Sequence, residues 1–370
     1  MYRSSYPKRN FHTNKSSSHG SRKHQGGKNY QKSSILPHRY IQQAIMQDDQ
    51  NSISITHRFE YFEIDPQLKL NIKLRGYEIP TPIQDQAIPL ILKGHDVVGI
   101  ANTGTGKTAA FLIPYINKII HNREEKVLIV VPTRELAVQI NDELSALARS
   151  LSIRSSLLIG GASLNRQIGE LRLKPHVLIG TPGRLKDLII RRLVLLTNFR
   201  NIVLDEVDRM VDIGFIHDIR YIISQLPKEK QSLFFSATVS TEIYTIIQSF
   251  MINPTTVSVK ATETAHGIDQ DVIRVKDKDE KLAKLQFLLK QEEFKKVLIF
   301  GRTKWGVEKL SKLLQQNGFQ VASIHGNKSQ NQRLRALTQF RRNQLQALVA
   351  TDVVARGIDI TDVSHVINFD

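Results

Sequence analysis

Cysteine is absent from the 370-residue sequence, which excludes disulfide bonds and thiolate metal sites and suits a reducing compartment. The chain also lacks any apolar stretch of the ~18 residues that a membrane-spanning helix needs. Its N-terminal segment has no apolar core like that of a secretory signal peptide. We therefore expect a cytoplasmic protein without a membrane partner.

Acidic residues are absent from residues 1–47, which carry nine Lys or Arg. The whole chain has a formal charge of +17, so the remaining residues contribute 17 − 9 = +8. The segment is rich in Ser, Lys, His and Gly, and it has too little apolar surface to offset the entropy of ordering. We predict a disordered basic tail, whose charges and scattered aromatics suit loose single-strand binding. A plain solubilising tail and an organelle transit peptide are the alternatives.

From Phe59 onward, short apolar runs alternate with amphipathic stretches, which is typical of parallel βαβ units. The first group of runs covers residues 96–101, 127–132, 155–160, 176–180, 201–205 and 232–237. A polar stretch at 259–270 is typical of a linker, and the runs resume at 297–301, 321–326, 347–352 and 365–370. The sequence therefore predicts two α/β domains in tandem.

The stretch ANTGTGKT follows one predicted strand and opens a predicted helix. Gly104 and Gly106 allow a tight loop whose N–H groups point at phosphate oxygens. Lys107 supplies charge for the outer phosphates, and the Thr108 hydroxyl is placed to coordinate Mg²⁺. The usual pattern begins with Gly where this chain has Ala101, and a turn without a ligand is the alternative. The predicted cradle comprises Ala101, Asn102, Thr103, Gly104, Thr105, Gly106, Lys107 and Thr108.

The acidic stretch LDEVD ends a separate apolar strand about a hundred residues downstream. A carboxylate in this position can hold Mg²⁺ while its neighbour takes a proton from the attacking water. We assign Asp205 to the metal and Glu206 to the base. A solvated acidic loop is the alternative for this stretch taken alone.

Further short motifs accompany these two in a fixed order. They are GYEIPTPIQ (76–84), PTRELA (132–137), GG (160–161), TPGR (181–184), SAT (236–238), HGN…QNQR (325–333) and ATDVVARGIDI (350–360). In this order and spacing the chain strongly resembles the DEAD-box RNA helicases of superfamily 2, of bacterial type. The resemblance implies two RecA-like domains with parallel sheets flanked by helices. It implies a Q-motif region at 57–85, an ATP-binding domain at 86–260 and an incomplete C-terminal domain at 261–370.

The resemblance also implies roles for single residues. Phe59 and Gln84 match the motif that recognises adenine, which implies ATP as the nucleotide. Ser236 and Thr238 match the element that links the nucleotide site to strand separation. Positions matching RNA-backbone contacts are Thr133, Arg134, Gly161, Thr181 and Arg184 in the first domain and Arg333 and Thr351 in the second; Gly357 and Asp359 match positions that close on the nucleotide.

The function implied is an ATP-dependent RNA helicase, acting as a monomer on RNA of any sequence and separating short duplexes locally. ATP and RNA would both favour a closed arrangement of the domains and so bind with positive coupling. An RNA-binding clamp with little ATP turnover and a superfamily 2 DNA helicase are the alternatives. The RNA, the pathway and any ribosomal or RNA-decay partners stay open.

The chain departs from the family pattern at several positions. Val207 stands where the family has Ala, Gly301 and Arg302 replace a small apolar residue and Asn, and Asn327 replaces the commoner Asp. The arginine motif HRxGRxxR does not occur in the 370 residues. We expect the second domain to be incomplete at this point, with residues 365–370 poorly covered. We also expect slow hydrolysis, because such an arginine contributes roughly 10³–10⁵-fold in rate.

Overall fold

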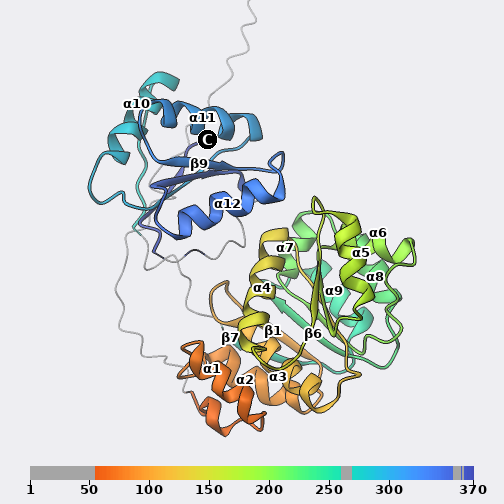
Figure 1. Cartoon of the computed structure of the whole chain (residues 1–370). Helices are drawn as coiled ribbons and strands as arrows, with labels where there is room; N and C mark the ends of the chain where they lie inside the picture. The colour runs from red at the N-terminus through yellow and green to blue at the C-terminus, as the bar shows by residue number, and fades with distance from the viewer. Residues whose placement is uncertain (1–54, 260–268, 353–359, 361) are drawn as a thin grey trace, which may run out of the picture.

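The computed structural model describes residues 55–259, 269–352, 360 and 362–370. The predicted tail at 1–47 lies outside the described residues, as do Gly357, Asp359 and residues 260–268 of the predicted linker. Figure 1 shows the described chain as two lobes, each built around its own sheet. Within the described residues, no helix combines the length and apolar character that crossing a membrane would require.

The first domain contains a seven-stranded, wholly parallel sheet in the order β3-β4-β2-β5-β6-β1-β7. Every residue of β2, β4, β5 and β6 is buried, which explains why these strands appear in the sequence as continuous apolar runs. The strands are β1 (Val97–Ala101), β2 (Val127–Val130), β3 (Ser155–Leu158), β4 (Val177–Gly180), β5 (Asn201–Leu204), β6 (Gln231–Ser236) and β7 (Thr255–Val259).

Helices cover both faces of this sheet and form two apolar clusters with it. The cluster on one face is built with α1 to α4, and the cluster on the other with α6 to α9. The helical elements are η2 (Phe59–Tyr61), α1 (Pro66–Leu74), α2 (Pro82–Leu92), α3 (Lys107–His121), α4 (Arg134–Leu147), α5 (Leu164–Arg172), α6 (Pro182–Ile190), α7 (Val207–Asp212), α8 (Ile216–Ser224) and α9 (Thr241–Phe250).

Strand β7 is the one element of this sheet that the sequence analysis did not predict. It lies at the sheet edge beside β1, and only Val257 and Val259 of its five residues are buried. A strand that exposes its Thr and Ser residues has no apolar run, so it is easily taken for part of the linker.

The second domain contains a four-stranded parallel sheet in the order β11-β8-β10-β9. Its elements are α10 (Lys278–Leu289), β8 (Val297–Phe300), α11 (Lys304–Gln316), β9 (Val321–Ile324), α12 (Gln330–Arg341), β10 (Ala347–Ala350) and β11 (His365–Asn368). Edge strand β11 is only half covered. Ile367 and Phe369 pack on the core, whereas the side chain of Val366 is 58% exposed.

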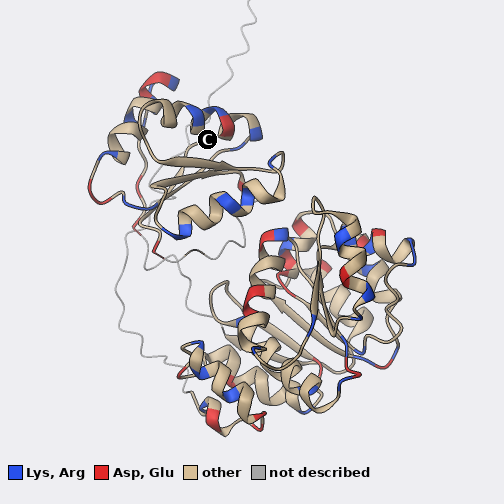
Figure 2. Cartoon of the chain, viewed as in Figure 1, with Lys and Arg blue, Asp and Glu red and all other residues tan. Residues whose placement is uncertain are grey.

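Because both sheets are parallel, the loops that follow their strands meet at one edge of each sheet, where ligands of such folds bind. In the first domain these loops carry the phosphate cradle, Thr133, Thr181 and Asp205, and Ser236 ends β6 at the same edge. Helix α12 of the second domain lies on the side that faces the first domain (Figure 1). Basic positions recur along it (Figure 2).

Candidate functional site

The loop between β1 and α3 has the backbone of a phosphate cradle. Gly104 and Gly106 adopt φ angles of 84° and 90°, in the left-handed region that favours glycine. A side chain at Gly106 would also collide with Gln84 and Thr81. The loop therefore opens the N-terminus of α3 with its N–H groups free of side-chain obstruction, as anion binding requires.

Lys107 begins α3, and its side chain bends back over the loop. The residue is 6% exposed, and its Nζ donates to the carbonyl oxygen of Ala101 at 2.9 Å. Thr105 closes the turn by donating from Oγ1 to the Asn102 carbonyl at 2.8 Å. A buried ammonium group with a single carbonyl partner retains two N–H donors for phosphate oxygens.

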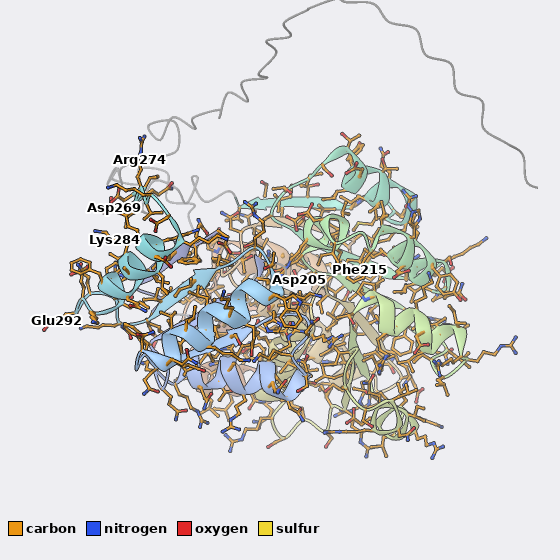
Figure 3. The ribbon with its side chains drawn as sticks, turned by 90° about the horizontal axis from the view of Figure 1, so that it is seen from above. Asp205, Phe215, Asp269, Arg274, Lys284 and Glu292 are labelled. Atoms are coloured by element: carbon orange, nitrogen blue, oxygen red, sulfur yellow. The ribbon has the colours of Figure 1, made fainter. Side chains whose placement is uncertain are left out.

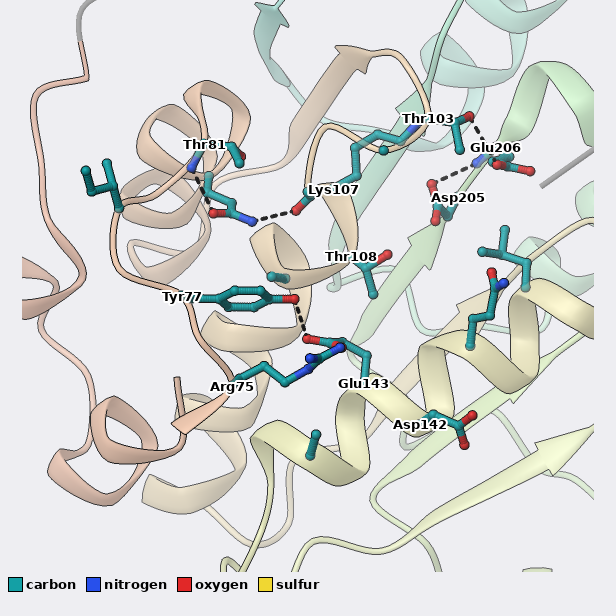
Figure 4. A pocket seen from close by; sticks show the side chains of 18 of the residues that line it. Arg75, Tyr77, Thr81, Thr103, Lys107, Thr108, Asp142, Glu143, Asp205 and Glu206 are labelled. Carbon is teal, nitrogen blue, oxygen red and sulfur yellow. Dashed lines mark hydrogen bonds and ion pairs between the residues drawn. The ribbon is translucent and has the colours of Figure 1, made fainter. Parts of the chain in front are cut away.

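Gln84 ties the upstream region to this loop. Its Oε1 accepts from Thr81 N at 2.9 Å, which caps α2, and its Nε2 donates to the Gly106 carbonyl at 3.0 Å (Figure 4). The sequence analysis assigned Gln84 to the nucleotide site, and the structure places it in the wall of the same cavity.

Phe59 lies behind that wall. It is 5% exposed and stacks on Tyr77 with ring centroids 6.3 Å apart, and it is not among the residues that line the cavity. Tyr77 lines the cavity instead, and its hydroxyl donates to Glu143 Oε1 at 2.6 Å. Phe59 therefore supports Tyr77 in this structure, and its role in recognising adenine stays a prediction. Tyr77 was given no role in the sequence analysis, although it lies within GYEIPTPIQ.

The acidic pair follows β5. Asp205 is 2% exposed, and its Oδ1 accepts from the backbone N–H of Glu206 at 2.9 Å. Glu206 has a φ of 52°, an unfavourable conformation for a residue with a side chain, and it is the N-cap residue directly before α7. Its Oε2 lies 3.0 Å from Nη1 of Arg209, and its Oε1 accepts from Thr103 Oγ1 at 3.5 Å. The carboxylates of the adjacent residues Asp205 and Glu206 therefore have different partners: the first accepts from a backbone N–H, and the second pairs with Arg209.

The pKa of Asp205 is raised from 3.8 to about 6, and burial is the largest cause of the net rise. The negative charges of Glu206 and Asp208 raise it further, while Lys107 and the hydrogen bond from Glu206 N act in the opposite direction. Taking a buried carboxylate out of water makes its charged form costly, and a bound cation would offset this cost.

Asp208 connects the acidic stretch to the SAT motif, a role that the sequence analysis did not assign. Its Oδ2 accepts from the N–H groups of Ala237 and Thr238 at 3.1 Å each and from Thr238 Oγ1 at 3.3 Å. Its own N–H donates to Ser236 Oγ at 3.3 Å. The geometry of β5 and that of β6 are therefore coupled at their carboxyl ends. Val207, between the acids, is fully buried in an apolar cluster.

These groups surround a cavity of ≈570 Å³. Its wall includes Thr81, Gln84, Thr103, Gly104, Gly106, Lys107, Thr108, Asp205 and Glu206 (Figure 4). Asp142 of α4 and Arg341 of α12 also line it, so the second domain contributes to its rim. A nucleotide in this cavity would touch both domains.

A second cavity, of ≈510 Å³, is also lined by residues of both domains. Five of the predicted RNA contacts line it: Thr133, Arg134, Thr181, Arg184 and Arg333. Gly161 lies beside it, and a side chain there would collide with the guanidinium of Arg134. Nη1 of Arg184 is buried and has no hydrogen-bond partner among the residues that the structure describes, which suits a site for an anionic ligand. Thr351 is 8% exposed and is not among the lining residues.

Arg333 carries a second role that its sequence position did not indicate. Its Nη2 lies 2.8 Å from Oε2 of Glu135, and the side chains are 7% and 1% exposed. Burial lowers the pKa of Arg333, the charge of Glu135 raises it and that of Arg134 lowers it. This ion pair joins α12 of the second domain to α4 of the first.

The two parallel-sheet domains, the glycine cradle with its lysine and the buried acidic pair define a nucleoside-triphosphate-binding protein of the two-domain helicase class. Comparisons with known proteins make this specific. A family described as DEAD/DEAH box helicase matches residues 81–246, and one described as Helicase conserved C-terminal domain matches residues 278–370. The chain belongs to the DEAD-box helicase family.

Among its relatives, the chain is 44% identical over 315 residues to "ATP-dependent RNA helicase CshA" of Limosilactobacillus reuteri, covering 85% of this chain and 63% of that protein. It is 42% identical over 320 residues to "DEAD-box ATP-dependent RNA helicase CshA" of Bacillus subtilis strain 168, covering 85% and 64%. The chain thus spans less than two thirds of the length of these relatives.

Two solved structures extend the likeness to both domains. A DEAD box protein from Methanococcus jannaschii is 35% identical, with a TM-score of 0.53 over 84% of this chain and 85% of that one. Dbp5 of S. cerevisiae bound to RNA and ADP BeF3 is 29% identical, with a TM-score of 0.73 over 85% and 81%.

Proposed function

We propose that the chain is an ATP-dependent RNA helicase that hydrolyses Mg-ATP and separates short RNA duplexes. The observation that carries this proposal is the joint construction of two cavities by the same pair of domains. One cavity, here called the nucleotide cavity, is lined by the cradle and the acidic pair. The other, here called the RNA cavity, is lined by five of the predicted RNA contacts. Family membership supports the same activity.

Lys107 and the N–H groups after Gly104 hold the phosphate end of the nucleotide, and Gln84 and Tyr77 contribute to the wall of the same cavity. Glu206 is positioned by Arg209 and by its own backbone to accept the proton of the attacking water. Asp208 then passes any change at the acidic pair to Ser236 and Thr238, because its carboxylate joins the two strands.

The residues present fit Mg²⁺. Asp205 and Thr108 offer a carboxylate and a hydroxyl on one cavity wall, and Mg²⁺ prefers such oxygen ligands together with phosphates and water. The buried Asp205 carboxylate, costly when charged alone, is stabilised by a cation. When bound, the ion neutralises charge that develops on the phosphates during their transfer.

Closure of the two domains links the cavities. Glu135 and Asp142 lie seven residues apart on α4, and Arg333 and Arg341 lie eight apart on α12, so each pair occupies one helix face. Glu135 and Arg333 line the RNA cavity, whereas Asp142 and Arg341 line the nucleotide cavity. Either ligand therefore favours the same contact between α4 and α12, which gives positive coupling.

We propose RNA as the ligand of the RNA cavity. Its arginines, threonines and backbone groups suit phosphate and sugar oxygens rather than base edges. The S. cerevisiae relative of similar two-domain structure is bound to RNA and ADP BeF3, which supports the same ligands for this chain. We place the protein in the cytoplasm, acting as a monomer.

The test measures phosphate release with and without single-stranded RNA, and strand separation on RNA and DNA duplexes of matched sequence. We expect ATP turnover that rises with RNA, and separation of the RNA duplex alone. Equal activity on both duplexes contradicts the RNA assignment, and absence of turnover contradicts the ATPase. Lys107→Ala, which removes the phosphate-binding charge, controls for contaminating ATPases.

A further inference from the structure

The most exposed large hydrophobic side chain among the described residues is Trp305, at 81%. It is also the only tryptophan in the chain. The side chain takes part in no hydrogen bond, ring contact or cation–π contact within the part of the chain that the structure describes. A tryptophan so far from the core gains little for folding, so its position calls for a partner outside the chain.

Trp305 lies at the ligand-binding edge of the second sheet. It occupies the first turn of α11, directly after β8, and Thr303 caps that helix by accepting from Gly306 N at 3.0 Å. The loop after β9 reaches the same edge, and so does Thr351, the residue that follows β10. The equivalent edge of the first domain carries the nucleotide and the RNA cavities.

The surroundings of Trp305 are basic and continuous with the RNA cavity. Arg302 and Lys304 are both exposed on either side of Thr303. The end of the Lys304 side chain lies beside Gly326, since a Cβ built there would stand 3.3 Å from Lys304 Cε. Gly326 itself lines the RNA cavity together with Arg333. Two nearby carboxylates are already paired: that of Asp370 lies 3.4 Å from Lys281 Nζ, and that of Glu308, on the next turn of α11, lies 3.0 Å from Lys328 Nζ.

We propose that Trp305 is a base-stacking platform for single-stranded RNA leaving the cavity between the domains, with Arg302 and Lys304 holding the adjacent phosphates. An exposed indole offers a flat face on which any base stacks, and flanking cations follow the backbone. The proposal rests on the proposed RNA-binding function and deepens it. It adds a sequence-independent contact to bases, whereas the cleft offers contacts to phosphate and sugar only.

Stacking has a distinct dependence on the bases of the ligand. Loss of one base–aromatic stack weakens single-strand binding by roughly five- to a hundredfold. A ribose-phosphate oligomer without bases presents the same charges but no face to stack on. Trp305→Ala should therefore weaken binding of oligoadenylate by that factor and leave binding of an abasic oligomer of equal length unchanged.

The experiment uses the single tryptophan as its own probe. Oligoadenylate is added to the full chain in the presence of a non-hydrolysable ATP analogue, while tryptophan emission and the anisotropy of a labelled oligomer are both recorded. We expect quenching of emission that follows the anisotropy curve, and no quenching by the abasic oligomer. Trp305→Phe should keep most of the affinity, because the ring still stacks.

Phe287 supplies a matched control. It is 55% exposed, and the Nζ of Lys284 lies 5.2 Å from its ring centroid. It lies near the end of α10, where the Leu289 carbonyl accepts from Gln346, the residue before β10 and thus at the opposite edge of the sheet. Figure 3 shows Lys284 at the outer margin of the second domain. Phe287→Ala should leave RNA affinity unchanged.

Several results would overturn the inference while leaving the proposed function in place. One is RNA binding by anisotropy with unchanged tryptophan emission and with full affinity in Trp305→Ala. Equal weakening toward oligoadenylate and the abasic oligomer would assign Trp305 to the backbone or to folding. Quenching that depends on protein concentration alone would make the surface a contact between copies. Absence of RNA binding by every measure would instead overturn the proposed function itself.

Discussion

The two domains meet their ligands with surfaces of opposite kinds. At the ligand edge of the first domain, Gln84 is buried and paired with the cradle, Lys107 is buried and paired with Ala101, and the half-buried Asp208 is paired with the SAT motif. At the same edge of the second domain, Arg302, Lys304 and Trp305 are exposed. The first domain is prepared for one rigid ligand, and the second presents an adaptable surface suited to a flexible strand.

Between these surfaces, the Glu135–Arg333 pair is the contact whose burial requires both domains together. If the two domains separated, both charged side chains would be exposed to water, and neither would remain buried without a partner. Buried ion pairs of this kind contribute little net stability but hold a specific arrangement. The difference between the surfaces therefore predicts that mutations at the acidic pair and the cradle act on chemistry, whereas mutations at the contact act on coupling.

The largest effect is expected from Asp205→Asn. The change keeps the hydrogen bond from Glu206 N but removes the charge that we propose holds Mg²⁺. We expect kcat for ATP to fall by at least roughly a hundredfold, because a bound metal contributes several kcal/mol to charge stabilisation. Steady-state phosphate release measures this. Asp279→Asn, exposed on α10, is the matched control, and wild-type turnover in Asp205→Asn would contradict the assignment.

The same variant should be more stable than the wild type above pH 6. The pKa of Asp205 is about 6 when folded and 3.8 in the reference state, so the folded chain binds a proton more tightly. Its stability therefore falls as pH rises from 3.8 to 6, and the loss is complete above 6. We expect urea unfolding at pH 7 to give Asp205→Asn a free energy of unfolding about 1–3 kcal/mol higher than that of the wild type. The difference should vanish near pH 4. A variant less stable than the wild type at pH 7 would contradict this prediction.

An intermediate effect is expected when the contact between the domains is broken. Arg333→Met leaves Glu135 buried without a partner in the closed arrangement, which favours the open one. The increase in RNA affinity caused by an ATP analogue should shrink by roughly five- to a hundredfold. Arg335→Met, exposed on the same helix, tests for a general charge effect and should behave as wild type. Adding Glu135→Gln to this variant should restore part of the coupling between ATP and RNA. If it does not, the two residues do not act as a pair.

A smaller effect is expected at the link between the acidic stretch and β6. Asp208→Asn removes at least one of the three bonds that Oδ2 accepts from Ala237 and Thr238. We expect the free energy of unfolding to fall by about 1–3 kcal/mol and strand separation to fall more than ATP turnover. Thr238→Ser keeps the hydroxyl and should resemble the wild type. Equal losses in both activities would show that Asp208 acts on chemistry alone.

The smallest effect lies in the second domain, at Glu308. Hydrogen bonds from Ser323, Lys328 and His325 lower the pKa of Glu308 from 4.5 to about 2, despite burial acting in the opposite direction. The stabilisation is present above pH 4.5 and is lost as pH falls toward 2. Glu308→Gln should lower stability at pH 7 by at most about 1 kcal/mol, since the side chain is partly exposed. Urea unfolding at pH 7 and at low pH checks this, and a difference that persists at pH 2 would contradict it.

Local patterns allowed much of the fold and site to be predicted. Strands buried on both faces produce continuous apolar runs, and the cradle depends on consecutive residues, so both are visible in the sequence. The features that were missed depend on distant residues. Glu135 and Arg333 are 198 positions apart (333 − 135), the Asp208 bonds span about 30, and the stack of Phe59 on Tyr77 joins two separate segments. No local period reports such contacts.

The central claim is that ATP and RNA are coupled through closure of the two domains. The most direct test is the affinity of the chain for a single-stranded RNA, measured with and without a non-hydrolysable ATP analogue, in the wild type and in Arg333→Met. We predict binding at least roughly fivefold tighter with the analogue in the wild type, and a ratio near one in the variant. A ratio of one in the wild type, with both ligands shown to bind, would contradict the account.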